Sequence, residues 1–314
     1  MRVAVVGVIG RLGSALVAAL EEAPFTGPSG PIRWDQPEFE LDTLTVDSAG
    51  ALLDRDRPLV VVHTAAWTDV DGCARDPELA MRRNGTAAGV LAAACAIRGI
   101  DLIVISTNEV FDGRRTDGRG YAPGDERNPI NPYGAAKAAA ERLAIDAYEA
   151  DGAGGRLGIV RTSWLYGPPG NDFPAKIAAA ALRARDAGTP LRAVGDETGV
   201  PTYTPDLAEA IVELIAADAI APAPARTAIH HLVNGGRATR ADWAREGIRA
   251  VGIDVEVEEV PVSTWQRASV PPLWAVLEPT PMPSGEPMRD WREAFADAVP
   301  ALRRGLREAT SPDG

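Results

Sequence analysis

The chain has 314 residues, 46% of them hydrophobic, which is enough to bury a core in one large domain or two modest ones. The formal net charge of -12 at pH 7 argues against nucleic acid and anionic membrane surfaces as partners, since both select basic proteins. Glycines interrupt the apolar N-terminus, and no apolar run approaches the roughly 18 residues of a membrane span. The two cysteines, Cys73 and Cys95, lack the spacing of metal ligands, so we expect reduced thiols in an unanchored cytoplasmic protein.

Short β-branched runs alternate with longer segments rich in Ala, Leu and Arg through the first half of the chain. We expect strands at 2–6, 31–36, 59–63, 101–106 and 157–162. Runs such as LVVV and LIVI are apolar without alternation, which is typical of parallel strands covered by helices on both faces. Segments between them, such as 77–98, have the length and composition of helices. This order of elements predicts an α/β fold with a Rossmann-type doubly wound parallel sheet.

The regular alternation ends near residue 165. We therefore predict a Rossmann-type domain over 1–165 and a smaller mixed α/β region over 166–314, with elements around 190–235 returning to the larger domain. The second half is expected to contain a helix, a strand, a proline-rich irregular stretch and a last amphipathic helix, at 175–187, 228–234, 270–287 and 288–306 respectively.

A glycine loop follows the first expected strand. Gly7, Gly10 and Gly13 are spaced by three residues in VVGVIGRLGSALVAAL and lead into an amphipathic segment. Glycines allow a tight turn and bring backbone N–H groups close to a pyrophosphate, which the dipole of the helix N-terminus also attracts. The spacing differs from the usual G-x-G-x-x-G, and a βα turn without a ligand is the alternative interpretation.

Asp35 ends the second expected strand, where an acidic group can accept hydrogen bonds from the adenosine ribose. A plain turn residue is an equal alternative. A carboxylate there disfavours a 2'-phosphate, but Arg11 and Arg33 lie nearby in sequence, so both NADH and NADPH stay open as cofactors.

Polar and small residues follow two later strands. Ala65 and Ala66 come after LVVVH, and Ser106, Thr107 and Asn108 end DLIVIS and begin the next turn. Ligands of doubly wound sheets bind at the carboxyl ends of strands, so these residues are expected at one site.

In NPINPYGAAK, Asn131 is a suitable N-cap and Pro132 a suitable first helical residue. Tyr133 and Lys137 then lie one turn apart on the same helix face. A lysine ammonium beside a phenol lowers the phenol pKa and makes it a better proton donor to a carbonyl oxygen, to which Ser106 or Thr107 can also bond. A tyrosine and a lysine four apart are common by themselves. Their order after a glycine loop and a Ser/Thr strand end is what indicates a short-chain dehydrogenase/reductase site.

The chain resembles the dTDP-4-dehydrorhamnose reductase family of extended short-chain dehydrogenase/reductases over most of its length. The phrases that carry the resemblance are HTAAWTDVDGCARDPELAMRRNGTAAGVLAAAC, ISTNEVFDG, NPINPYGAAKAAAE, VRTSWLYG, GVPTYTPDLA, HLVNGG and DWREAF. The resemblance implies NADPH- or NADH-dependent reduction of the 4-keto group of a dTDP-6-deoxy-4-keto-hexose, giving dTDP-L-rhamnose or a related deoxysugar. It assigns NAD(P) binding to residues 1–165 and the nucleotide sugar to residues 166–314.

The resemblance also implies roles for individual residues. Tyr133 would be the general acid and Lys137 its electrostatic partner and ribose anchor, with Thr107 and Ser106 polarising the carbonyl. The positions that match cofactor contacts are Gly7, Gly10, Arg11, Leu12, Gly13, Asp35, Ala65, Ala66, Trp67, Tyr133 and Lys137. Those that match the sugar side are Val70, Thr107, Asn108, Glu109 and Trp164, although Trp164 can equally be core packing.

Two segments depart from the family pattern. The family has Asp-Tyr after its Ser-Thr, where this chain has Asn108 and Glu109. Its Arg-Pro-x-x-Ser-x-Leu-Asp phrase is reduced here to VPPLWAVLE at 270–278. Both departures bear on the identity of the sugar more than on the type of reaction.

Two other functions stay open. One is a non-catalytic nucleotide-binding subunit resembling the regulatory subunit of methionine adenosyltransferase, which would not need Tyr133 and Lys137. The other is a nucleotide-sugar epimerase or dehydratase of the same superfamily, for which Glu109 supplies a further acid/base group. No metal site is expected, since the histidines lack neighbouring Cys, Asp or Glu ligands, and a homodimer is left open.

Overall fold

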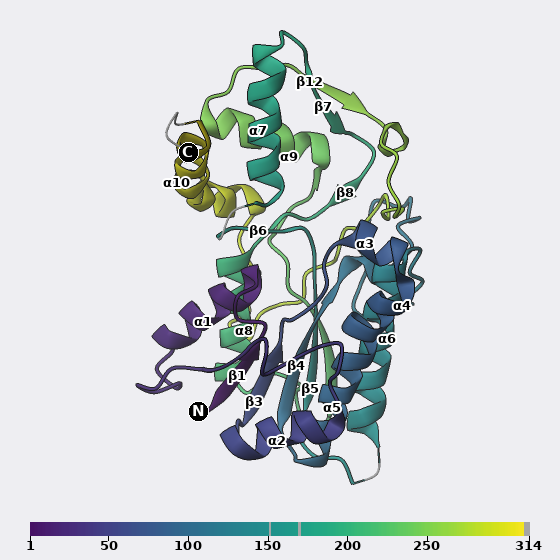
Figure 1. Ribbon diagram of the computed structural model, residues 1–314, viewed down its shortest axis with the longest axis vertical. Coiled ribbons are helices and arrows are strands. Elements are labelled where there is room, and N and C mark those ends of the chain that lie inside the picture. The colour runs from purple at the N-terminus through teal and green to yellow at the C-terminus, as the bar shows by residue number, and fades with distance from the viewer. Residues whose placement is uncertain (151, 169–170, 311–314) are drawn as a thin grey trace.

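The larger lobe is built around a six-stranded sheet in the order β10-β5-β4-β3-β1-β2, with every neighbouring pair parallel. The computed structural model describes residues 1–150, 152–168 and 171–310. The strands of this sheet are β1 Val3–Val6, β2 Ile32–Trp34, β3 Val60–His63, β4 Asp101–Thr107, β5 Leu157–Thr162 and β10 Thr227–His231. The predicted Rossmann-type doubly wound sheet is confirmed (Figure 1).

The unalternating strands bury both of their faces. Val3 and Val5 pack into one core with Leu16 and Leu20 of α1, whereas their neighbours along β1 point into the opposite core. Side chains alternate across a strand, so a strand with apolar residues at every position requires helices on both sides.

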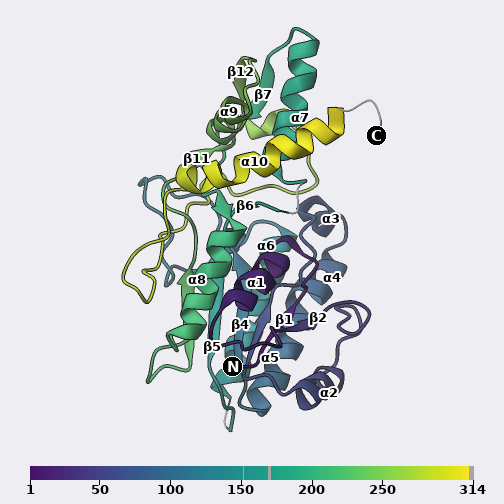
Figure 2. The same ribbon diagram turned by 90° about the vertical axis from the view of Figure 1, so that its left-hand side faces the viewer.

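Helices cover the two faces in sets. α1 and α8 lie against each other on one face, and α2, α5 and α6 cover the other (Figure 2). Their bounds are α1 Arg11–Glu22, α2 Val46–Asp56, α5 Ala87–Ile97, α6 Pro132–Glu149 and α8 Thr204–Ala216. The helix expected at 77–98 is helical but composite: α4 Pro77–Ala80 passes through a π-helical turn, Met81–Thr86, into α5. A short α3, Val70–Arg75, precedes it.

The smaller lobe is a mixed α/β layer above the strand ends (Figure 1). It contains α7 Phe173–Asp186, α9 Arg240–Val251, α10 Trp291–Thr310 and the parallel pair β7 Leu191–Val194 and β12 Val257–Val260. Short pairs complete it, β8 Thr198–Gly199 with β11 Ala238–Thr239 and β6 Leu165–Tyr166 with β9 Thr202–Tyr203.

The stretch 190–235 divides between the lobes. β10 and α8 rejoin the larger lobe, because β10 extends the sheet beyond β5 and α8 packs on α1. β7 does not rejoin it, because Leu191 and Ala193 bury their side chains against α7 and α9. The proline-rich stretch 270–287 has isolated bridges in place of regular strands, at Trp274 and Leu277.

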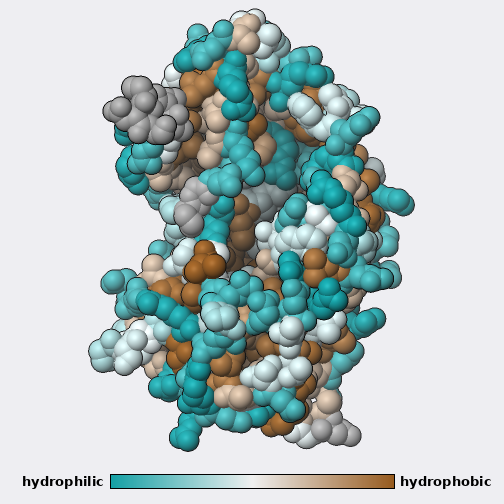
Figure 3. Space-filling view, viewed as in Figure 1, coloured by the Kyte–Doolittle hydropathy of each residue, from teal (hydrophilic) through white to brown (hydrophobic). Residues whose placement is uncertain are grey.

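A cavity of about 630 Å³ separates the lobes, and the surface is visibly hollowed there (Figure 3). Residues of the glycine loop, of the ends of β3, β4 and β5, and of α6 line it from below, and Arg240 of α9 lines it from the smaller lobe. In the described part of the chain, no helix is both long and apolar enough to cross a membrane.

Candidate active site

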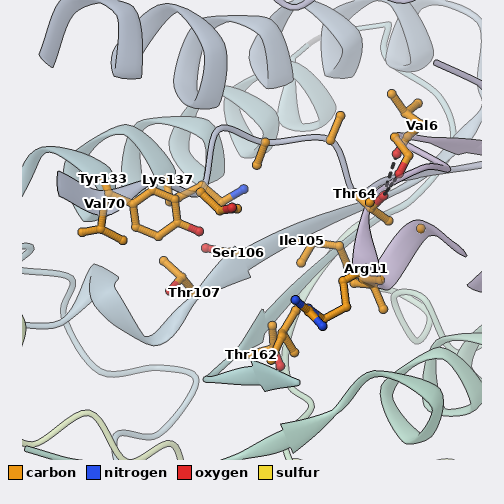
Figure 4. A pocket seen from close by; sticks show the side chains of 18 of the residues that line it. Val6, Arg11, Thr64, Val70, Ile105, Ser106, Thr107, Tyr133, Lys137 and Thr162 are labelled. Carbon is orange, nitrogen blue, oxygen red and sulfur yellow. Dashed lines mark hydrogen bonds between the residues drawn. The ribbon is translucent and has the colours of Figure 1, made fainter. Parts of the chain in front are cut away.

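The glycine loop is held in a tight turn at one end of the cavity. Gly7 has φ +86°, and its N–H donates to the carbonyl oxygen of Trp34 at 2.9 Å. Thr64 donates its hydroxyl to the carbonyl oxygen of Val6 at 2.7 Å (Figure 4). A Cβ at Gly13 would lie 2.0 Å from the carbonyl oxygen of Gly7. The loop therefore needs glycine at both positions and presents the N-terminus of α1 to the cavity, as a pyrophosphate site requires.

Asp35 lines the same end of the cavity and also braces the loop. Its Oδ2 accepts the N–H of Ile9 at 3.0 Å, and its Oδ1 accepts the N–H of Gln36 at 2.8 Å. Of the two nearby arginines, only Arg11 lines the cavity, where it approaches Asp172 at 3.4 Å. Arg33 pairs with Glu21 on α1.

Tyr133 and Lys137 enter the cavity from the first two turns of α6. The helix begins as expected, since Asn131 accepts the N–H of Gly134 at 2.8 Å and Pro132 follows it. Figure 4 shows the phenol and the ammonium beside each other, with the phenol oxygen directed at the end of β4. Both side chains are therefore delivered to one place by helix phasing alone.

The electrostatics of this pair differ from the expectation that Lys137 lowers the pKa of Tyr133. Burial raises the pKa of Tyr133, the Glu109 carboxylate adds to the rise, and a hydrogen bond with Thr107 opposes it. Burial also lowers the pKa of Lys137 to about 8, against the charge of Glu141, which raises it. The phenol thus keeps its proton at neutral pH, because desolvation disfavours the charged form of each group.

Ser106 and Thr107 both lie at the strand end, but their hydroxyls have different hydrogen-bond partners. Ser106 donates to a carboxylate oxygen of Glu141, which is fully buried and pairs with Arg161 at 2.7 Å. Thr107 donates its hydroxyl to Asn108 Oδ1 at 3.1 Å, accepts the N–H of Glu109 at 3.2 Å and bonds the phenol of Tyr133. Both hydroxyls therefore have protein partners: Ser106 bonds a fully buried carboxylate, whereas Thr107 bonds residues that line the cavity.

The residues expected on the sugar side mostly line the cavity. Val70, Glu109 and Trp164 do so, and Trp164 also stacks on Trp243 at 5.8 Å between ring centroids, so it serves the core as well. Asn108 lines it too, but its amide donates to the carbonyl oxygen of Ala275 at 3.2 Å.

The remaining expected cofactor residues separate into two groups. Gly10, Leu12, Ala65 and Ala66 line the cavity. Trp67 does not: its N–H bonds Asn84 at 2.7 Å, and Arg83 lies over its ring at 5.5 Å. At Trp67 the chain no longer follows the ends of the strands, so this side chain does not reach the cavity.

Sequence reasoning missed residues that the fold brings to the cavity from far away. Arg240 crosses from α9, lies 3.5 Å over the ring of Trp164 and bonds Glu197 through two nitrogens, at 3.1 and 2.9 Å. Thr162 ends β5 and lines the cavity, and its Oγ1 has no hydrogen-bond partner among the residues described. The capping sequence Thr239 to Asp242 signals a helix start, but not which cavity that start faces.

Comparisons with known proteins agree with this geometry. The sequence profile of the family described as RmlD substrate binding domain matches residues 1–304. The chain belongs to this family. It is 35% identical to the dTDP-4-keto-6-deoxy-D-glucose reductase of Streptomyces niveus over 95% of its own length and 96% of that protein. It is also 37% identical to the dTDP-4-dehydrorhamnose reductase of Streptomyces griseus over 78% of each.

Among solved structures, the dTDP-4-dehydrorhamnose reductase of Bacillus anthracis in complex with NADP superposes with a TM-score of 0.81. That pair is 26% identical, and the match covers 96% of this chain and 99% of that one. The predicted dTDP-4-dehydrorhamnose reductase family is therefore confirmed.

The two departures noted in the sequence meet at Asn131, which bonds both of them. Asn131 Nδ2 donates to Glu109 Oε2 at 2.7 Å and lies 3.1 Å from the carbonyl oxygen of Val270, the first residue of the altered VPPLWAVLE segment. Glu109, which lines the cavity, is thus linked through Asn131 to the second altered segment.

The histidines and cysteines lie outside the lining of the cavity. His230 and His231 bond backbone carbonyl oxygens, and burial with the nearby charge of Lys137 lowers the pKa of His63 to about 3. Cys73 and Cys95 are free and buried.

Proposed function

We propose that this protein reduces the 4-keto group of a dTDP-6-deoxy-4-keto-hexose with NADH or NADPH, giving dTDP-L-rhamnose or a related deoxysugar. The observation that carries the proposal is the meeting of Tyr133, Lys137 and Thr107 in the cavity that the glycine loop also lines. The Gly7–Gly13 contact fits a dinucleotide, because it leaves no room for side chains where a pyrophosphate approaches. A reduced nicotinamide bound in this cavity supplies the hydride.

Tyr133 is the general acid of this reaction. Its phenol is protonated at neutral pH, and Thr107 orients it through a hydrogen bond. As the carbonyl oxygen gains negative charge, Thr107 donates a hydrogen bond to it and Tyr133 transfers its proton to it.

Lys137 has two roles in this reaction, one toward Tyr133 and one toward the cofactor. Its buried ammonium stabilises the phenolate that Tyr133 becomes. Lys137 also lines the cavity, so it is the residue we propose to hold the nicotinamide ribose. Burying a lysine without a role is costly, so its retention here supports an enzyme over a non-catalytic nucleotide-binding subunit.

A second cavity, of about 370 Å³, supports a nucleotide sugar as the substrate. It shares Arg240 with the main cavity, so the two adjoin. Four cationic side chains and an exposed tryptophan line it, namely Lys176, Arg192, Arg240, Arg267 and Trp265. In a chain of net charge -12, this local group suits a diphosphate, and the indole suits a pyrimidine ring.

The test is a panel of dTDP-4-keto sugars offered with NADH and with NADPH. We expect loss of reduced-nicotinamide absorbance and a product heavier than its substrate by two hydrogens. Absence of turnover with every sugar and both cofactors would refute the proposal.

A further inference from the structure

Glu109 has a free carboxylate oxygen in the cavity. It lies in the short turn Asn108–Val110 directly after β4, beside Thr107 and on the same cavity wall as Tyr133. Its Oε2 accepts from Asn131 at 2.7 Å. Its Oε1 accepts no hydrogen bond from any residue that the structure describes.

The surroundings of Glu109 favour proton uptake. Burial raises the pKa of its carboxyl, the hydrogen bond from Asn131 opposes this rise, and the charge of Glu197 adds to it. Glu109 in turn raises the pKa of Tyr133, so the charges of the two groups interact. Arg240 and Arg267 favour its ionised form. A carboxylate held in this way is a stronger base than one in water.

The other acidic residues that line the cavity are already engaged. Asp35 accepts the N–H of Gln36 at 2.8 Å with one oxygen and the N–H of Ile9 at 3.0 Å with the other. Asp172 accepts the N–H of Ala175 at 3.0 Å with one oxygen and the N–H of Gly167 at 2.9 Å with the other. Among the described residues that line the cavity, Glu109 is therefore the carboxylate with an oxygen left for a ligand.

We propose that Glu109 is a general base that removes a proton from the carbon next to the substrate ketone, so that the protein enolises its keto sugar as well as reducing it. The inference rests on the proposed function, since it takes the same keto sugar into the same cavity.

The step balances without a redox partner. The C–H bond next to the carbonyl breaks, and its proton goes to Glu109. The electron pair forms the C=C bond of an enolate, whose oxygen accepts hydrogen bonds from Thr107 and Tyr133. Return of the proton from Glu109 to carbon restores the ketone.

The experiment separates this step from reduction. The protein is incubated in D2O with a dTDP-4-keto-6-deoxy-hexose and NADP⁺, which cannot donate hydride, and the sugar is followed by mass spectrometry. We expect one deuterium to enter the sugar faster than in buffer alone. For Glu109→Gln, the ratio of the exchange rate to the NADPH-dependent reduction rate should fall about 100-fold, the lower range of a general-base contribution.

A matched control is Glu126→Gln, which removes an exposed glutamate and should leave both rates unchanged. NADPH binding by the Glu109→Gln protein checks that its cleft is folded. Reduction by the wild-type protein without deuterium uptake would overturn the enolisation and leave the proposed function intact. Equal exchange in wild type and Glu109→Gln would also overturn it. Absence of both reduction and exchange would refute the proposed function together with this inference.

Discussion

Tyr133 shows how burial decides the state of a catalytic group. The spacing of Tyr133 and Lys137 predicts a phenol with a lowered pKa, whereas burial raises it and keeps the proton in place. A reduction needs that proton, since the alkoxide must be protonated. The side chain is therefore suited to the reductive direction through its surroundings as much as through its neighbour.

We expect Tyr133→Phe to lower kcat by about 10²–10⁴-fold, the usual contribution of a general acid. The affinity for NADPH should change by less than about tenfold, because one hydrogen bond at most is lost. Steady-state kinetics and a fluorescence titration with NADPH test both statements. Full activity in the variant would remove Tyr133 from the mechanism.

Lys137 should impose a pH limit on reduction. Its pKa is lowered to about 8, so the ammonium loses its charge as pH rises through 8, where a solvated lysine would stay charged. We expect kcat/KM to fall above about pH 8, since neutral lysine cannot stabilise the phenolate. A profile that stays flat to about pH 10 would contradict this.

Glu141 joins three elements of the larger lobe through one buried carboxylate. It lies on α6 one turn after Lys137, accepts from Ser106 on β4 and pairs with Arg161 on β5. Glu141 and Arg161 are 0% and 1% exposed, so neither charge has water to replace a lost partner. This network holds the first turns of α6 against the strand ends.

Glu141→Gln should therefore lower the free energy of unfolding by about 3–5 kcal/mol, as breaking a buried ion pair does. It should also move the alkaline limit of kcat/KM to lower pH, because the charge of Glu141 raises the pKa of Lys137. Urea unfolding and a pH–rate profile measure the two effects. Asp146→Asn, on an exposed position of the same helix, is the control. An unchanged pH limit would argue that Glu141 acts on stability alone.

The glycine loop gives a second prediction at the level of structural elements, after that for Glu141. A Cβ at Gly13 would overlap the carbonyl oxygen of Gly7, so Gly13→Ala must shift the loop. We expect a loss of about 1–3 kcal/mol in stability and weaker NADPH binding. Gly247→Ala in α9 is the control, because a Cβ there meets no atom within 4 Å and should stabilise the helix slightly. Equal NADPH affinity in both variants would contradict the assigned loop.

The chain leaves the larger lobe and returns to it twice, and this path brings residues of both lobes to the cavity. α8 and β10 return to the sheet after the smaller lobe has begun, and Met282 packs back into the larger core before α10 rejoins the smaller lobe. Arg240 thereby faces Trp164 across the cavity. Substrate recognition thus depends on both lobes, although the acid and its lysine come from one.

We expect dTDP to stabilise the protein against thermal unfolding, by about 2.7 kcal/mol at 100 times its Kd. Arg240→Ala should weaken dTDP and raise the KM of the sugar substrate more than that of NADPH. Arg142→Ala, at an exposed position of α6, is the charge-matched control. NADPH binding by the Arg240→Ala protein shows that its larger lobe is folded, and an undiminished response to dTDP would exclude Arg240 from the nucleotide site.

The local sequence pattern was sufficient to predict the parallel sheet, the glycine turn and the capped helix that carries Tyr133 and Lys137. Each depends on residues a few positions apart, whose spacing is set by strand and helix periodicity. The commitment of Ser106 to Glu141, the pKa of Tyr133 and the crossing of Arg240 could not be predicted in this way. They depend on which distant residues share a buried volume and on how much water reaches it, and only the packing of the two lobes decides both.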